Sequence, residues 1–284
     1  MNRFLLTVLG ALLCISEPSF AQDKVPFDAS TSGTEENVLA FVGKKTFVRK
    51  DESWPPQDPD VIYMDSRYQA RYKIGQLVAG EYDAETIDFH AYDHYGMPRF
   101  SRPKNVLIFV HDGPNTRWHS KYNFYEVHRT SDGDWAACGN AYVQNDPDEE
   151  QKEPLEAISF LSPVEVNVSS LLLFVEDEYE PDELVTDTER AEVQAELDEE
   201  NAETEGLYQP PIWNRQGNVA TCQMGTRVAD LYKFQNESRF LPDRREKICH
   251  KRFAQEIEAL EDDEDAQDAL IDSCTSLLKI QNLP

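Results

Sequence analysis

Hydrophobic and polar residues alternate in two segments of the first half of the chain, at 68–74 and 87–91. Alternation with a period of two is typical of β-strands that bury one face. Turn residues at Gly80–Asp83 separate these two segments. A third segment, Val106–Val110, is apolar throughout, as in a strand that is covered on both faces. We expect these strands to share one interior that contains Ile74, Phe89 and Phe109.

Further strands are expected on either side of these three. The apolar run that begins at Val38 predicts a first strand, with a bulge or bend at Gly43. The Asp132-Gly133 pair lies between two segments rich in β-branched and aromatic residues, which predicts a hairpin that ends at Cys138. Five or six short strands at this spacing predict a small antiparallel barrel, OB-like, over residues 37–144.

The residues of these strands resemble the netrin/TIMP-like branch of the OB-fold barrels. The resemblance rests on Leu39–Lys44, on Ala70–Ile74 with Gly80 after it, and on Val106–Val110. It implies the barrel topology alone. A Cys-Gly pair of that family is replaced here by Tyr95-Gly96, and its zinc-chelating amino-terminal cysteine has no counterpart, so metalloprotease inhibition is not implied.

The second half of the chain differs in composition. From Asp146 to Glu205 there are 22 Asp and Glu residues against only Lys152 and Arg190, so we treat residues 145–206 as an acidic connector. The sequence Thr186–Glu189 is a capping box and predicts one helix that ends near Glu200. We interpret this helix as a solvent-exposed connection between two folded parts. The alternative is that it is an acidic docking surface for a basic partner.

Residues 207–284 are predicted to be mostly helical. Helical spacing of apolar residues begins after Pro242, stops at the acidic residues 261–265 and then resumes. The two helices would form a hairpin that buries Ile248, Cys249, Phe253, Ile257 and Leu260 of the first helix and Ala266, Leu270, Cys274, Leu277 and Leu278 of the second.

Cysteine positions predict two disulfides. Cys14 lies in a predicted export signal, so four cysteines remain in the mature chain. Cys249 lies 13 residues before Asp262 and Cys274 lies 12 after it, so a hairpin that folds back there brings both to the same level. We therefore predict a Cys249–Cys274 bridge and, by elimination, a Cys138–Cys222 bridge.

The amino terminus and the net charge suggest where the protein acts. Residues 1–21 have the charged start, apolar run and small-residue cleavage site of a secretory signal peptide, and a polar leader follows at 22–36. A lipoprotein anchored at Cys14 is the alternative. No later segment is long and apolar enough to span a membrane. The formal net charge of −27 disfavours nucleic acid as a partner and allows cationic partners or divalent metals.

No catalytic motif is present in the sequence, but histidines and aromatic residues gather in one region. Five of the six histidines lie between positions 90 and 128. His90, His94, His111 and His119 are the candidate ligands for Zn²⁺ or Cu²⁺. The alternative is that these are surface and loop histidines. The same region holds a candidate aromatic binding face for a protein, peptide or glycan, made of Tyr92, Tyr95, Trp118 and Tyr122.

The sequence therefore predicts an α+β protein: a barrel, an acidic connector and a disulfide-linked helical hairpin. The favoured function is an exported, non-enzymatic binding or inhibitor-like module of the cell envelope, periplasmic or secreted, without a cofactor. The runner-up is a periplasmic protein that binds Zn²⁺ or Cu²⁺ through the region from His90 to His128. A hydrolase comes third, because Asp93, His94 and Asp112 lack a nucleophile or a defined metal beside them.

Overall fold

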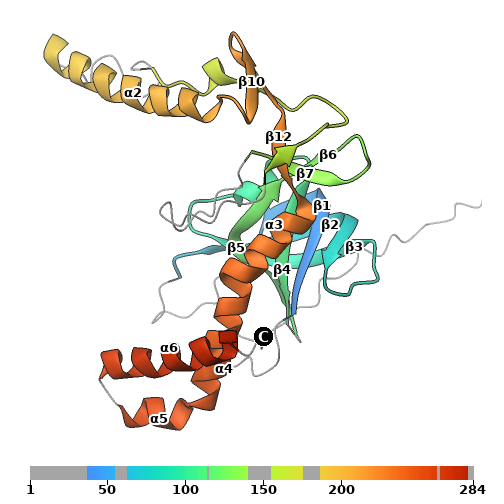
Figure 1. Cartoon of the computed structure of the whole chain (residues 1–284), viewed down its shortest axis with the longest axis vertical. Helices are drawn as coiled ribbons and strands as arrows, with labels where there is room; N and C mark the ends of the chain where they lie inside the picture. Colours follow the sequence, from blue (N-terminus) through green and yellow to red (C-terminus); the bar gives the residue numbers. More distant parts are fainter. Residues whose placement is uncertain are drawn as a thin grey trace, which may run out of the picture.

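The structure, a computed structural model, describes residues 37–54, 63–113, 115–139, 155–174, 186–260 and 263–280. The predicted signal peptide and leader lie outside the described residues. Between residues 37 and 126 the described chain forms five strands and one short 3₁₀-helix (Figure 1): β1 (Asn37–Lys50), β2 (Ser66–Ala79), β3 (Thr86–Asp93), η1 (Arg99–Ser101), β4 (Val106–Asp112) and β5 (Arg117–Glu126).

The five strands pair into a closed ring in the order β1-β2-β3-β5-β4. Four of the five pairings are antiparallel, as predicted, but β3 and β5 run parallel and meet at His90 and Trp118. The predicted bulge at Gly43 is confirmed by a register shift between Val42 and Gly43. A β-carbon at Gly43 would lie 2.8 Å from the ring of Phe41, so the close approach there requires glycine.

The interior of the ring is filled by the residues whose alternation predicted the strands. The apolar residues of β2 and β3 point inward between half-buried and exposed polar neighbours. Phe100 of η1 enters the same interior, where its ring centroid lies 5.9 Å from that of Tyr72 and 6.0 Å from that of Phe89. This core consists of Leu39, Phe41, Tyr68, Ala70, Tyr72, Ile87, Phe89, Ala91, Phe100, Val106, Ile108 and Val110, with Ile74 packed against its edge.

The prediction that Phe109 shares this interior is wrong. Val106, Ile108 and Val110 of β4 point inward, so by the parity of a strand Leu107 and Phe109 point outward. They are covered by α3 (Val228–Gln235) and the π-helical turn η3 (Asn236–Phe240), which contribute Val228, Leu231 and Phe240 to a second core. The apolar run of β4 is thus buried on both faces, by the ring on one side and by a helix on the other.

A single continuous helical stretch leaves the ring (Figure 1). It runs through α3, η3 and α4 (Leu241–Arg252), so the helix predicted to begin at Pro242 begins at Val228 instead. A proline inside a regular helix lacks an N–H and meets the carbonyl four residues before it, here that of Ser238. The wider π turn lies at these residues and lets the helix continue past Pro242.

The predicted helical hairpin is present at the carboxyl end of the described chain. It is formed by α4, α5 (Ala254–Ala259) and α6 (Glu264–Ile280), and the predicted Cys249–Cys274 disulfide joins α4 to α6. Ile271 is buried beside the bridge, whereas Leu277 is 56% exposed and Ile248 is 37% exposed. These two residues were therefore placed wrongly: each is one helical position from the residue that faces the partner helix, Cys249 in α4 and Leu278 in α6.

Two small sheets lie between the ring and the acidic helix. One has the order β6-β7-β12-β8 and the other β10-β11-β9. The predicted Cys138–Cys222 disulfide joins β7 to β11. The bounds are β6 (His128–Arg129), β7 (Trp135–Cys138), β8 (Glu156–Ala157), β9 (Glu165–Asn167), η2 (Val168–Ser170), β10 (Trp213–Gln216), β11 (Val219–Cys222) and β12 (Met224–Arg227). The predicted hairpin turn at Asp132-Gly133 joins β6 to β7.

The acidic helix α2 (Asp187–Leu207) projects away from the ring (Figure 1). Its predicted capping box is confirmed, since the Glu189 backbone N–H donates to Thr186 Oγ1 and the Thr186 N–H donates to the Glu189 carboxylate. The helix runs seven residues beyond the predicted end. Leu197 is buried, and the Asn201 side chain hydrogen-bonds both the N–H and the carbonyl of Leu173. One side of the helix is therefore attached to the segment that follows η2.

Candidate functional site

The four predicted aromatic residues separate into three environments. Tyr92 points outward from β3 and packs against Trp54, with a ring centroid distance of 5.7 Å, and Trp118 stacks on His111 at 5.3 Å. Both are half-buried. Tyr95 and Tyr122 are 86% and 39% exposed. Only these last two present their rings to a partner as the prediction required.

Tyr95 and Tyr122 belong to a surface that we call the Tyr122 patch: Met64, Tyr95, Met97 and Tyr122. Met64 is 67% exposed and Met97 is 48% exposed. His94 joins two of these residues, because its Nδ1 lies 2.7 Å from the Met64 carbonyl oxygen and its ring lies 4.9 Å from that of Tyr95. Aromatic residues and methionine are enriched at protein interfaces, so this composition is typical of a binding surface.

An ion pair links Tyr122 to the rest of the patch. Lys121 Nζ lies 2.8 Å from the carboxylate of Asp65, the residue that follows Met64. The same ammonium group lies 5.1 Å from the centre of the Tyr122 ring, within the range of a cation–π interaction. The patch therefore draws on the start of β2, the loop after β3 and the middle of β5.

The backbone of Tyr122 is strained. Its φ is +67°, the only positive φ of a non-glycine residue in the described part of the chain. A left-handed conformation costs about 1–2 kcal/mol for such a residue and persists only where its surroundings hold it. The strain lies in a bulge of β5, because β4 pairs Val110 with His119 and Ile108 with Phe124, which leaves four residues of β5 opposite one of β4.

A buried polar network lies under this bulge. His119 Nε2 donates to the Asn123 carbonyl at 2.9 Å, and Asn123 Nδ2 donates to Ser120 Oγ at 2.7 Å. Arg239, from the turn η3, donates to Asn123 Oδ1 at 3.0 Å. His119, Ser120 and Asn123 are each at most 6% exposed. The network crosses from the ring to the long helix and fixes the loop that exposes Tyr122.

His119 is neutral in this network. Burial lowers its pKa to about 3, and the hydrogen bond to Asn123 offsets only part of that effect. Because a carbonyl can only accept, the neutral imidazole carries its proton on Nε2. His119 is thus a structural residue of the bulge, beside Phe100 at a ring distance of 4.5 Å.

The four histidines predicted to bind metal lie in separate environments. His119 is in the core, His90 Nδ1 lies 3.2 Å from Thr116 Oγ1, His94 contacts Met64 and Tyr95 of the Tyr122 patch, and His111 stacks on Trp118. Within the described ranges, no group of three or more His, Cys, Asp and Glu side chains is arranged to hold a metal ion. The geometry adds no support to the metal hypothesis.

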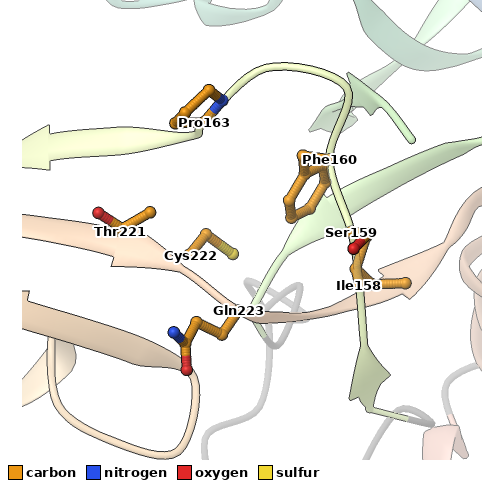
Figure 2. A pocket seen from close by; sticks show the side chains of 7 residues that line it. All are labelled: Ile158, Ser159, Phe160, Pro163, Thr221, Cys222 and Gln223. Atoms are coloured by element: carbon orange, nitrogen blue, oxygen red, sulfur yellow. The ribbon is translucent and has the colours of Figure 1, made fainter. Parts of the chain in front are cut away.

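A shallow depression lies beside the Cys138–Cys222 disulfide. Figure 2 shows the residues that line it: Ile158, Phe160, Pro163 and Cys222, together with the polar residues Ser159, Thr221 and Gln223. Its volume is about 370 Å³, and it is wide open to solvent. It contains no ionisable side chain, so it offers no acid, base or metal ligand for chemistry.

Sequence reasoning missed several residues of the site. Met64 and Met97 lie in loops and Lys121 lies in the bulge of β5, and single residues in such segments follow no periodic pattern. Arg239 lies more than a hundred positions from Asn123, and only the path of the long helix brings the two together. Tyr122 was predicted to bind, but nothing in its local sequence indicates a left-handed backbone.

Comparison with models of protein families, with curated proteins and with solved structures finds no match to this chain. The fold and the site define a disulfide-bonded α+β protein with a five-stranded ring and an exposed aromatic patch. In the part of the chain that the structure describes, no helix has the length and apolar character needed to cross a bilayer.

Proposed function

We propose that the chain is an exported, non-enzymatic binding or inhibitor-like module of the cell envelope and that the Tyr122 patch is its ligand-binding surface. The observation that carries the proposal is the strained Tyr122, held outward by the network of His119, Asn123 and Arg239. The network also attaches the long helix to the ring, but the left-handed backbone of Tyr122 adds strain without burying its ring. Such strain is found most often at functional sites.

Two further features support this proposal. Two disulfides suit a protein of an oxidising compartment, in agreement with the predicted signal peptide. The strand order of the ring and its parallel β3–β5 pairing are consistent with an OB-like barrel, and such barrels serve as binding scaffolds in many unrelated proteins. The netrin/TIMP-like resemblance contributes the barrel topology to the proposal and no activity.

Site-directed photo-crosslinking tests the proposed surface. A photoreactive phenylalanine analogue at position 95 or 122 of residues 22–284, exposed to envelope extract of the source cell, is expected to form one major adduct. The control carries the analogue at Leu161, which is 67% exposed and lies outside the patch. Equal adduct yields from positions 95, 122 and 161 would contradict the proposal.

A second variant separates binding from folding. Replacing Tyr122 with glycine removes the ring and also relieves the left-handed backbone, so the free energy of unfolding should rise by about 1 kcal/mol. The same variant should capture at least tenfold less of the crosslinked partner. Glu126→Gly is the matched control: it lies exposed in the same strand without a positive φ, and should lose about 0.5–1 kcal/mol while keeping the partner.

A further inference from the structure

The loop beside the Tyr122 patch has an unusual charge. Residues 94–111 contain no Asp or Glu, although the whole chain holds 54 of them among 284 residues. The same stretch carries three cations, Arg99, Arg102 and Lys104, all exposed. Within the described residues, none of their side chains forms an ion pair. A strongly acidic protein therefore presents a local positive surface next to its exposed aromatic residues.

The packing of η1 fixes this positive loop against the patch. Phe100 is 1% exposed and its ring lies 4.5 Å from that of His119, within the network that holds the Tyr122 bulge. The carbonyl of Ser101 accepts a hydrogen bond from Lys45 Nζ at 2.6 Å. Arg99 and Arg102 flank these two anchored residues, and Met97 precedes them by two positions. Arg99 lies two positions from Met97 of the patch, and the Arg102 N–H donates to the Arg99 carbonyl at 3.0 Å, so the chain places these cations, which we call the rim, next to the Tyr122 patch.

In the described part of the chain, no carboxylate near the patch forms an ion pair with this rim. Glu126 lies opposite Val106, two positions from Lys104, and its nearest cationic group is His128 at 3.8 Å. Asp65 pairs with Lys121 at 2.8 Å. Asp93 is 6% exposed and accepts the Tyr95 N–H at 2.9 Å. Arg99, Arg102 and Lys104 thus keep their charge available to a ligand.

We propose that the Tyr122 patch takes an acidic protein segment that inserts an aromatic or large aliphatic side chain. This inference rests on the proposed function and names the chemistry of its partner. The exposed rings and methionines fit an apolar anchor, and the three cations fit carboxylates on either side of it. An extended polyanion is disfavoured, because the remaining charge of the molecule repels it at long range.

Peptide selection tests this chemistry and does not require the partner to be identified first. A displayed library of random peptides of about 12 residues is selected on residues 22–284 and counter-selected on the Tyr95→Ser/Tyr122→Ser variant. The expected binders are enriched in Asp and Glu around one aromatic or large aliphatic residue. Their affinity should fall about tenfold when salt rises from about 0.1 M to about 0.5 M, because the rim charges are exposed and screened.

Charge variants with equal net charge locate the effect. The triple variant Arg99→Gln/Arg102→Gln/Lys104→Gln should bind the selected peptides about tenfold more weakly. The control Lys44→Gln/Lys50→Gln/Lys251→Gln removes three exposed cations elsewhere and should stay within about twofold of the wild type. Equal losses in the two triple variants would overturn the inference.

The outcomes distinguish this inference from the proposed function. Neutral or basic peptides that still require Tyr95 and Tyr122 would refute the acidic partner and leave the binding surface standing. Binding by a soluble anionic polysaccharide such as alginate, with no selected peptide, would assign the surface to a glycan and overturn the inference. If no ligand distinguishes the wild type from the Tyr95→Ser/Tyr122→Ser variant, the inference and the proposed surface both fail.

Discussion

The ring and the carboxy-terminal hairpin are stabilised in different ways. The ring encloses a core of twelve buried residues and shares a second core with α3 and η3. Among its described residues, the hairpin buries only Cys249, Ile271, Cys274 and Leu278, with Phe253 and Ile257 packed at the edge. So few apolar residues cannot offset the conformational entropy of three helices. The comparison shows that the ring depends on burial, whereas the hairpin depends on its covalent link.

The long helix connects these two regions, and its first part, α3 and η3, contacts the ring and the network below Tyr122. Its first part, α3, lies in the second core of the ring, where Gln235 Nε2 donates to Tyr125 Oη at 2.9 Å. Its last part, α4, carries Cys249 of the hairpin. Arg239 lies between the two, at the turn that supports the Tyr122 bulge. We therefore expect damage to the ring to reach the binding surface and damage to the hairpin to leave it intact.

The largest expected effect comes from the ring core. Phe100→Ala removes a fully buried ring and should lower the free energy of unfolding by about 3–5 kcal/mol, measured by urea denaturation. Leu277→Ala on the exposed face of α6 is the control and should change it by less than about 0.5 kcal/mol. A loss for Phe100→Ala no larger than that of the control would show that the ring does not depend on its core.

Removal of the hairpin disulfide should have a smaller and local effect. Cys249→Ser/Cys274→Ser opens a loop of 25 residues, which costs about 3.5 kcal/mol in the chain-entropy model. We expect hydrogen exchange to accelerate in α4–α6 while the amides of β1–β5 keep their protection. Loss of protection throughout β1–β5 would show that the ring needs the hairpin and that the two regions are not stabilised separately.

The smallest expected effect is the pH response of the ring. His119 has a folded pKa of about 3 and an unfolded pKa near 6.5, so protonation favours the unfolded state. Above pH 6.5 the neutral His119 does not lower the free energy of unfolding. Below pH 6.5 the free energy of unfolding falls by about 1.4 kcal/mol per pH unit, a total loss of about 2 kcal/mol at pH 5. His119→Gln should remove this slope between pH 6.5 and pH 5. If the wild type and His119→Gln lose stability with the same slope over this pH range, the slope arises from other titratable groups.

Much of the fold was predictable because the signals were local. Alternation in β2 and β3, the bulge at Gly43 and the capping box at Thr186 each depend on residues close in sequence. Both disulfides were also predicted correctly: a hairpin brings Cys249 and Cys274, at nearly equal distances from its turn, to the same level, and Cys138–Cys222 followed by elimination. The helix start at Val228 was missed because proline usually marks a helix beginning, and the π turn at η3 removes that constraint.

The candidate site was predictable only in part. Tyr95 and Tyr122 were identified by residue type. Tyr92 and Trp118 are aromatic too, but Tyr92 packs against Trp54 and Trp118 stacks on His111. Residue type does not show which aromatic side chains remain exposed. That depends on neighbours from distant strands, which no local pattern specifies.

The sequence by itself determined the strands, the capped acidic helix and the Cys249–Cys274 bridge, because periodicity, capping and cysteine spacing act within short stretches of chain. The Cys138–Cys222 bridge then followed by elimination. Only the tertiary structure decided that β4 is buried by both the ring and α3, and that Tyr122 is held in a left-handed conformation. Those outcomes depend on contacts between distant segments, above all Arg239 with Asn123. Closing the ring and docking the long helix create these contacts, and neither is encoded at any single position.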